Sequence, residues 1–248
     1  MNTFKSILLA ITLFFSALLF GQSFQPQNKQ ELQTAVNLWV SDNETALSSY
    51  GEINSWDVSL ITDMSNLFIN KSSFNGDLSN WDVSSVTLMF NMFYNASSFN
   101  SDLSNWDVSN VTRMHDMFHK ANSFNADLSG WNVSNVTDIS QMFKEAYVFN
   151  SDLSNWDVSS VRNMSYCFYD ASAFNTDISN WDISNVNTMY DMFYGADALS
   201  DENKCSIDNS FSANQTWSYD WSSEINCSQY LPFQPQNKAE LQTAVDLW

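Results

Sequence analysis

The sequence predicts an α/β repeat solenoid in which each coil combines a short parallel strand with a short helix. Two aromatic residues recur at intervals of 25 residues without an insertion, and each series has six members. A fixed period of about 20–50 residues is typical of arrays whose units bury their apolar faces only against their neighbours. The array covers residues 50–199. The two series are Trp56, Trp81, Trp106, Trp131, Trp156 and Trp181, and Phe68, Phe93, Phe118, Phe143, Phe168 and Phe193.

The spacing of apolar residues within one unit indicates both elements of the coil. Residues 80–86 alternate apolar with polar side chains, which predicts a strand. In residues 89–96, apolar side chains recur at i, i+3, i+4 and i+7, which predicts one face of a short helix. We interpret the tryptophan, phenylalanine and methionine series as core rather than as a sugar-binding row. One asparagine per unit is expected to satisfy backbone groups at a turn: Asn75, Asn100, Asn125, Asn150 and Asn175.

A cap is predicted at each end of the array, because a terminal coil would otherwise expose its apolar face. Residues 24–49 form the amino-terminal cap helix and its connection. Asn28 to Glu31 resembles a capping box there, and apolar residues follow at helical spacing. The repeat fades after Ala196, and residues 200–231 are predicted to be a carboxyl-terminal cap. Within that cap, Cys205 and Cys227 are the candidates for a disulfide in an exported chain.

Two terminal segments lie outside the capped array. Residues 1–22 combine Lys5 with an apolar run, which predicts a cleaved signal peptide. The alternative is an uncleaved membrane anchor. Residues 233–248 repeat residues 24–39 with only two changes, so we expect them to begin a second, truncated module of a longer protein.

The charge and the missing motifs exclude several classes of function. A formal net charge of −19 repels nucleic acid and anionic membrane surfaces. It suits cationic ligands, divalent metals or uncharged partners. No second apolar stretch follows residues 1–22, so we expect a secreted or cell-surface chain without membrane insertion. The sequence has no nucleophile elbow, phosphate-binding glycine loop or zinc motif, and neither an enzyme nor an organic cofactor is predicted.

An aspartate recurs at one position of the unit, and two interpretations of it stay open. Carboxylates stacked ~4.8 Å apart repel each other, and calcium between the coils would offset that repulsion. Alternatively, each aspartate accepts hydrogen bonds from N–H groups of its own turn. Asn132 replaces an aspartate at a second recurring position, which the turn interpretation tolerates more easily. The calcium candidates are Asp77, Asp102, Asp127, Asp152 and Asp177.

The predicted ligand surface lies on the helical side of the coils. When the units of this one chain are compared, W-D-V-S barely changes, whereas the predicted helical turn does. Aromatic side chains at such a surface suit contact with protein or glycan. The alternative is neutral drift at solvated positions. The outer stripe consists of Tyr94, His119, Tyr169 and Tyr194, with Lys144 interrupting it.

Two histidines in one unit have a spacing that can bind a metal. His115 and His119 are four residues apart on the predicted helical turn. No third ligand recurs nearby, so we interpret both as variable surface positions, and no metal site is assigned to them.

The unit F-N-x-D-L-S-N-W-D-V-S-N-V-T-x-M-x-x-M-F resembles the BspA-like leucine-rich-repeat surface proteins of bacteria, as does the leading segment K-x-E-L-x-x-A-V-x-L-W. The resemblance covers Phe24 to about Leu199. It implies an irregular leucine-rich-repeat solenoid with a secreted or cell-surface role in adhesion and in binding extracellular protein or glycan. The alternatives are a structural spacer or stalk that displays other domains, and a secreted enzyme acting on polysaccharide. An enzyme should break its repeat where the catalytic residues lie, and this array is regular.

Overall fold

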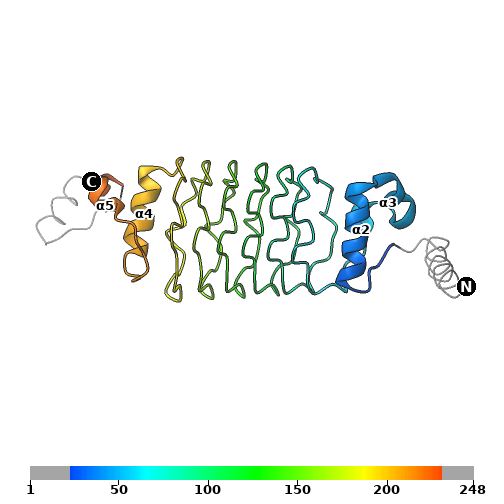
Figure 1. The fold of residues 1–248 in the computed structure, drawn as a ribbon. Coiled ribbons are helices and arrows are strands. Elements are labelled where there is room, and N and C mark those ends of the chain that lie inside the picture. Colours follow the sequence, from blue (N-terminus) through cyan, green and yellow to red (C-terminus); the bar gives the residue numbers. More distant parts are fainter. Residues whose placement is uncertain (1–22, 231–248) are drawn as a thin grey trace, which may run out of the picture.

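The computed structural model describes residues 23–230, which form one row of coils closed by helices at both ends (Figure 1). Successive coils lie side by side along the long axis of the molecule. The predicted signal peptide, residues 1–22, and the predicted second module, residues 233–248, lie outside the described residues. None of the described helices is long and apolar enough to cross a membrane.

The amino-terminal cap consists of α2 (Lys29–Ser41), α3 (Asn43–Tyr50) and the 3-10 helix η2 (Ile53–Ser55). The side chain of Asn28 accepts a hydrogen bond from the N–H of Glu31 at 3.0 Å. The Glu31 carboxylate accepts another from the N–H of Gln27 at 2.8 Å. The first bond satisfies an N–H group in the first turn of α2, which a helix leaves without an internal partner, and the second fixes the segment that leads into the helix. The face of α2 that covers the first coil buries Leu32, Ala35 and Val36.

The predicted α/β content of the coils is wrong. Between η2 and the helix that begins at Asp201, the described chain contains neither a helix nor a strand. Adjacent coils share only one parallel bridge each, such as the one between Asp63 and Leu88. The segment expected to be a strand turns on itself, because the N–H of Ser84 bonds to the Asp82 side chain at 3.0 Å. Such local bonds compete with the bonds that a neighbouring strand would offer.

The predicted helix is also replaced, in this case by consecutive turns. Asn91 and Asn95 have φ values of 55° and 56°, in the left-handed region that interrupts an α-helix. The backbone N–H groups of alternate residues donate to carbonyl groups of the next coil instead of to their own. The distances from Asn91 to His115 and from Asn95 to His119 are 3.0 and 2.7 Å. The apolar residues at i, i+3, i+4 and i+7 nevertheless point into the core and are buried: Met89, Met92, Phe93 and Ala96.

The core consists of aromatic rows that run the length of the array, as the sequence predicted. The rings of Trp131 and Trp156 stack with centroids 6.5 Å apart and planes 1° apart. Phe118 and Phe143 stack at 5.8 Å. The indole N–H of Trp131 donates to the carbonyl of Leu103 in the previous coil at 3.0 Å, so the buried tryptophan leaves no unpaired donor. Each coil thus packs on both neighbours through identical rings.

The recurring asparagine links successive coils, which confirms its predicted structural function. The side-chain oxygen of Asn75 accepts a hydrogen bond from the backbone N–H of Asn100 at 2.8 Å. The same bond recurs in every later coil, and at the end Asn175 accepts from the N–H of Ser200 at 2.8 Å. A row of side-chain oxygens therefore satisfies backbone groups that no strand pairs.

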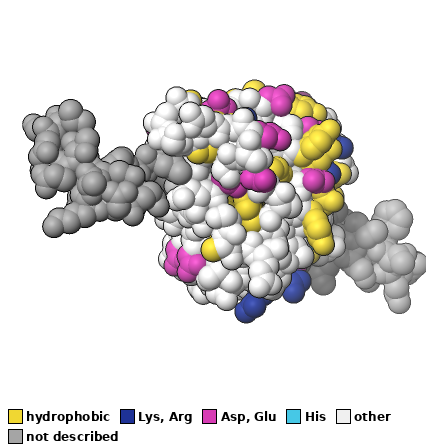
Figure 2. All heavy atoms as spheres, turned by 90° about the vertical axis from the view of Figure 1, so that its left-hand side faces the viewer, with side chains coloured by type: hydrophobic (Ala, Val, Ile, Leu, Met, Phe, Trp, Pro, Cys, Tyr) yellow, Lys and Arg dark blue, Asp and Glu magenta, His cyan; other side chains and the backbone are white. Residues whose placement is uncertain are grey.

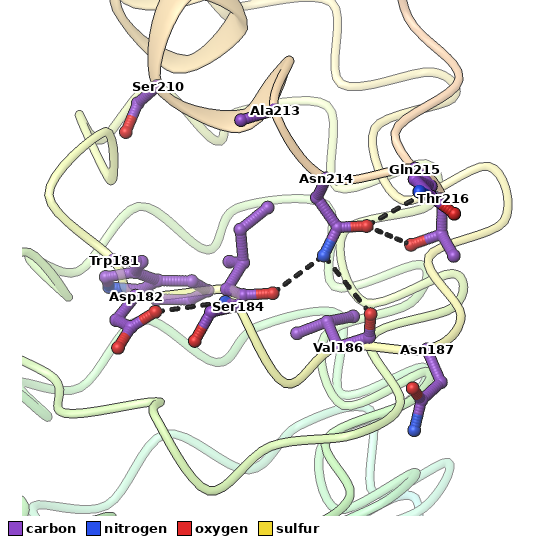
Figure 3. Close-up of a pocket in the computed structure, with 11 residues that line it drawn as sticks. Trp181, Asp182, Ser184, Val186, Asn187, Ser210, Ala213, Asn214, Gln215 and Thr216 are labelled. Carbon is purple, nitrogen blue, oxygen red and sulfur yellow. Dashed lines mark hydrogen bonds between the residues drawn. The ribbon is translucent and has the colours of Figure 1, made fainter.

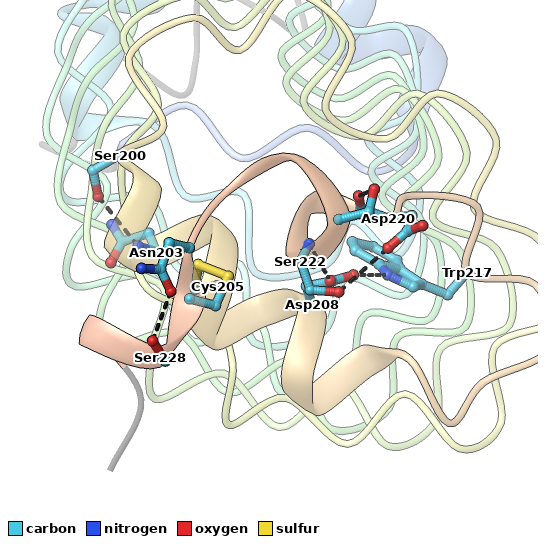
Figure 4. Close-up of a disulfide and its surroundings, with 11 residues drawn as sticks. Ser200, Asn203, Cys205, Asp208, Trp217, Asp220, Ser222 and Ser228 are labelled. Atoms are coloured by element: carbon cyan, nitrogen blue, oxygen red, sulfur yellow. Dashed lines mark hydrogen bonds between the residues drawn. A yellow bond between two sulfur atoms is a disulfide. The ribbon is translucent and has the colours of Figure 1, made fainter. Parts of the chain in front are cut away.

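The carboxyl-terminal cap consists of α4 (Asp201–Phe211), α5 (Trp221–Glu224) and the 3-10 helix η3 (Cys227–Gln229). A disulfide joins Cys205 on α4 to Cys227, the pair singled out in the sequence (Figure 4). The buried carboxylate of Asp208 accepts hydrogen bonds from the Trp217 indole at 2.7 Å and from the N–H of Ser222 at 2.9 Å (Figure 4). These bonds hold the two halves of the cap together.

The cap also supplies hydrogen-bond partners to the last coil, in the place of those that a further coil would provide. The Tyr219 hydroxyl accepts a hydrogen bond from the N–H of Phe193 at 2.8 Å. Burial raises the pKa of the Tyr219 phenol to about 12. The side-chain amide of Asn214 donates to the carbonyls of Ile183 and Val186 at 2.7 and 3.2 Å (Figure 3). Backbone groups at the open end of the array are therefore satisfied by side chains of the cap.

Candidate binding face

One side of the array combines a constant backbone with changing side chains. We call the outward side chains of one turn segment per coil the variable face, and its segments are residues 63–70, 88–95, 113–120, 138–145, 163–170 and 188–195. Each of the first five segments donates four backbone hydrogen bonds to the segment of the next coil, from Met64, Asn66, Phe68 and Asn70 in the first coil. The side chains differ from coil to coil, whereas the W-D-V-S turn stays nearly the same. The face thus presents different side chains on one repeated backbone.

The outer stripe predicted from the sequence forms two groups of contacting side chains on the variable face. Tyr94 and His119 meet edge to face with centroids 4.7 Å apart. The ammonium of Lys144 lies 5.0 Å from the centre of the Tyr169 ring. Tyr169 and Tyr194 stack at 4.9 Å. The exposure of these residues is unequal, because His119 is buried, Tyr94 and Tyr169 are half-buried, and Tyr194 is 59% exposed.

Two tyrosines that sequence reasoning missed extend the stripe sideways. Tyr166 lies 5.8 Å from Tyr169 and shares the Lys144 ammonium, which is 5.3 Å from the Tyr166 ring centre. Tyr190 is 66% exposed. Both belong to the variable face, but at different positions of the unit from the outer stripe. Comparing every position of the segment, rather than one, would have found them. We call Tyr166, Tyr169, Tyr190 and Tyr194 the tyrosine cluster, in which ring contacts join Tyr169 to Tyr166 and to Tyr194.

The tyrosine cluster lies among negative charges. Burial raises the pKa of the Tyr169 phenol, and the charges of Asp170, Asp191 and Glu145 raise it further. Asp191 is exposed on the same segment as Tyr190 and Tyr194. The positive charge that contacts the cluster is the Lys144 ammonium, which already lies over two of its rings. The cluster therefore favours a cation over an anion.

The two histidines face different carboxylates. His115 stacks on Phe90 at 4.8 Å, and its Nδ1 lies 3.9 Å from Asp138. His119 pairs through Nδ1 with Asp116 at 2.7 Å and is buried, so the interpretation of His119 as a surface position is wrong. Among residues 23–230, no group of three or more histidine, cysteine or acidic side chains could hold a metal ion.

Each calcium candidate is engaged in its own turn. One carboxylate oxygen of every such aspartate accepts a hydrogen bond from the N–H of the serine two residues later, at 2.9 Å in all five coils. The five are Asp77, Asp102, Asp127, Asp152 and Asp177. The N–H of Ser79, followed by its hydroxyl, holds the pKa of Asp77 below its ordinary value. In the second row, Asn132 accepts the same bond from Ser134 at 3.2 Å, so the turn does not require a charge. Turn capping accounts for both rows without an ion.

We expect this turn capping to make the array sensitive to acid. The folded-state pKa values of Asp77, Asp127 and Asp152 are lowered. Their contribution to the free energy of unfolding is therefore complete above about pH 4 and is lost as the pH falls further. Urea unfolding at pH 6 and at pH 3 measures this loss. Replacing all three by asparagine should keep the turns and reduce the difference between the two pH values. An unchanged difference would show that the acid sensitivity arises elsewhere.

A cavity of about 630 Å³ lies between the last coil and the carboxyl-terminal cap (Figure 3). Residues 181–187 of the coil and residues 210–216 of the cap contribute its described walls, with Asn214 bridging the two. Asp182 is the titratable side chain among the residues that line the cavity, and its carboxylate accepts a bond from the N–H of Ser184 at 3.0 Å. This lining pairs no nucleophile with a base, so we do not assign catalysis to the cavity.

The fold and the face define a class of protein: a stack of turn-built coils that encloses aromatic rows and carries one face of varying side chains. A family model described as Mycoplasma protein of unknown function, DUF285, matches residues 34–147 and again residues 126–226. The chain belongs to this family. The double match agrees with the repeated unit, and the finer resemblance to BspA-like proteins stays a prediction. No curated protein and no solved structure matches the chain.

Proposed function

We propose that the chain is a secreted or cell-surface module for adhesion, which binds extracellular protein or glycan through the variable face and performs no catalysis. The observation that carries the proposal is the division within each coil. Buried rings and inter-coil hydrogen bonds recur almost unchanged, whereas the outward side chains of the turn segment differ. Variation restricted to one face of a fixed scaffold suits recognition better than it suits a constant structural task.

The inter-coil hydrogen bonds favour binding for an energetic reason. Ordering a loop or a side chain on association costs free energy. The backbone of the variable face is already bonded to the next coil, for example from Phe93 to Met117 at 2.9 Å. Few backbone groups of the variable face would therefore have to be ordered when a partner binds. The resemblance to BspA-like surface proteins supports the same proposal, as do the aromatic side chains, which are enriched at interfaces.

A structural spacer is the second candidate, and the uninterrupted stacking favours it. The five interfaces between the six coils repeat the same bonds, which would give a stiff rod between other domains. A spacer makes no use of the variable side chains. Changing them should then leave every property of the protein unaltered.

The test is capture of the full exported chain on immobilised extracellular proteins, glycans and intact cells. Replacing Tyr94, Tyr169 and Tyr194 together by serine should weaken capture at least tenfold. Replacing Asn105 and Asn155, which are exposed away from the variable face, by serine should leave capture unchanged. Equal capture by both variants would contradict the variable face as the site, and capture by no surface would favour the spacer.

A further inference from the structure

The chain itself holds a cation against the tyrosine cluster. The ammonium of Lys144 lies 5.3 and 5.0 Å from the ring centres of Tyr166 and Tyr169 in the next coil. At these distances the negative faces of the rings attract a positive charge. Two tyrosines three residues apart in one turn segment therefore place their rings where one lysine can reach both.

The rings of Tyr190 and Tyr194 lie one coil further on, and the preceding coil has no lysine at the position equivalent to Lys144. The residue equivalent to Lys144 is Tyr169, which stacks on Tyr194 at 4.9 Å. Tyr190 and Tyr194 are 66% and 59% exposed and are the most exposed of the large hydrophobic side chains in the described chain. Contiguous exposed apolar patches mark interaction sites, and tyrosine is enriched among the residues that contribute most to binding.

The charges around the rings of Tyr190 and Tyr194 determine whether a positively or a negatively charged partner is attracted. Asp191 lies between Tyr190 and Tyr194 in the sequence and is exposed, and Asp170 and Glu145 act on the neighbouring Tyr169. The whole chain carries a net charge of −19. Figure 2 looks onto this end of the molecule and shows exposed hydrophobic side chains along one edge, with acidic side chains and a few Lys or Arg side chains beside them. The negative charges attract a positively charged partner, and the exposed rings offer it a surface to contact.

We infer that Tyr190, Tyr194 and Asp191 form a site for lysine or arginine side chains of a basic segment in an extracellular protein. The rings receive the ammonium or guanidinium group, and the Asp191 carboxylate supplies the opposite charge. Tyr194 occupies the position of Tyr169 in the next coil, whereas Asp191 occupies that of Tyr166, so a carboxylate takes the place of one of the two rings that contact Lys144. The inference rests on the proposed function and adds the chemistry of the partner.

The experiment titrates the full exported chain with a fluorescent peptide that alternates glycine and lysine, beside one that alternates glycine and serine. Replacing Tyr190 and Tyr194 by leucine should weaken lysine-peptide binding by about 5–25-fold, since each exposed ring contributes about 2–5-fold. Replacing both by phenylalanine keeps the rings and should change the affinity less than twofold. Asp191→Asn keeps the left-handed backbone, for which asparagine is suited, and should weaken binding in low salt more than in high salt.

Tyr147→Leu is the matched control, because Tyr147 is an exposed tyrosine, at 44%, outside the tyrosine cluster. It should bind the lysine peptide like the unaltered chain, and thermal unfolding checks that every variant is folded. Three results would overturn the inference: equal binding of both peptides, an unchanged affinity of the leucine variant, or the same loss with Tyr147→Leu. Capture of a neutral protein through the variable face without lysine-peptide binding would overturn this inference alone. Lysine-peptide binding without capture on any extracellular surface would instead contradict the proposed function.

Discussion

Truncation of Phe118 to alanine should lower the free energy of unfolding by about 3–5 kcal/mol. The Phe118 ring is fully buried and lies 5.6 and 5.8 Å from the equivalent rings of Phe93 and Phe143. It also lies 3.9 Å from Phe124 within its own coil. Removing the ring leaves a cavity that both neighbouring coils border. In a stacked array, where stability depends on nearest-neighbour contacts, both interfaces are weakened.

Tyr147→Ala is the control for this truncation, and urea unfolding measures both variants. Tyr147 is exposed, and its hydroxyl makes a long contact of 3.5 Å with the Glu145 carboxylate. Its removal should change the free energy of unfolding by no more than about 0.5 kcal/mol. A loss below about 1 kcal/mol for Phe118→Ala would mean that the rings do not form a close-packed row.

Removing the Cys205–Cys227 disulfide should destabilise the carboxyl-terminal cap by about 3 kcal/mol. The bond closes a loop with a sequence separation of 22, and closing a loop of that length restricts the unfolded chain by about that free energy. The cap covers the last coil through aromatic contacts, with the Trp221 and Trp217 rings 5.6 and 6.2 Å from that of Phe193. Loosening of the cap should therefore expose Phe193 and the end of the array.

The double variant Cys205→Ala/Cys227→Ala, compared with the unaltered chain by thermal unfolding, measures this effect. A reductant should lower the melting temperature of the unaltered chain toward that of the variant and should leave the variant unchanged. Cys167 does not complicate the comparison, because it is a buried free thiol and burial raises its pKa. If reduction leaves the melting temperature of the unaltered chain unchanged, the disulfide does not hold the cap.

The sequence allowed the period, the core and the asparagine row to be predicted, because each depends on identical residues at identical positions. Trp131, Phe118 and Asn125 contact their equivalents or the backbone in neighbouring coils. Stacking alone brings such residues together, whatever the backbone conformation between them. That is why the register was correct although both predicted elements of the coil were wrong.

The local conformation was missed because apolar spacing does not distinguish a helix from consecutive turns. Met89 and Phe93 are four residues apart and both buried, as on a helix, but left-handed Asn91 lies between them. Asparagine tolerates that conformation better than most residues. The asparagines at residues 66, 70, 91 and 95 were therefore the available signal, and the later coils obscure it with Gln141 and Tyr166.

The candidate site was predicted in outline only. Comparing the coils located the variable face and the outer stripe. It did not show that His119 is buried beside Asp116 or that Lys144 rests on Tyr166. The first contact joins two different positions of one segment, and the second joins different positions in adjacent coils, so that it depends on the twist and spacing of the stack. A single repeated position cannot reveal them.

Residue-resolved hydrogen exchange of the full chain tests most directly whether the variable face is a fixed platform. The amides of Asn91, Phe93 and Asn95 donate to carbonyl groups of the next coil at 3.0, 2.9 and 2.7 Å. They should exchange among the slowest in the protein, because they are released only when two coils separate. The amide of Ser104, bonded to the exposed Asp102 side chain, should exchange much faster. If all four exchange equally fast, the backbone behind the variable face is not held by the neighbouring coil.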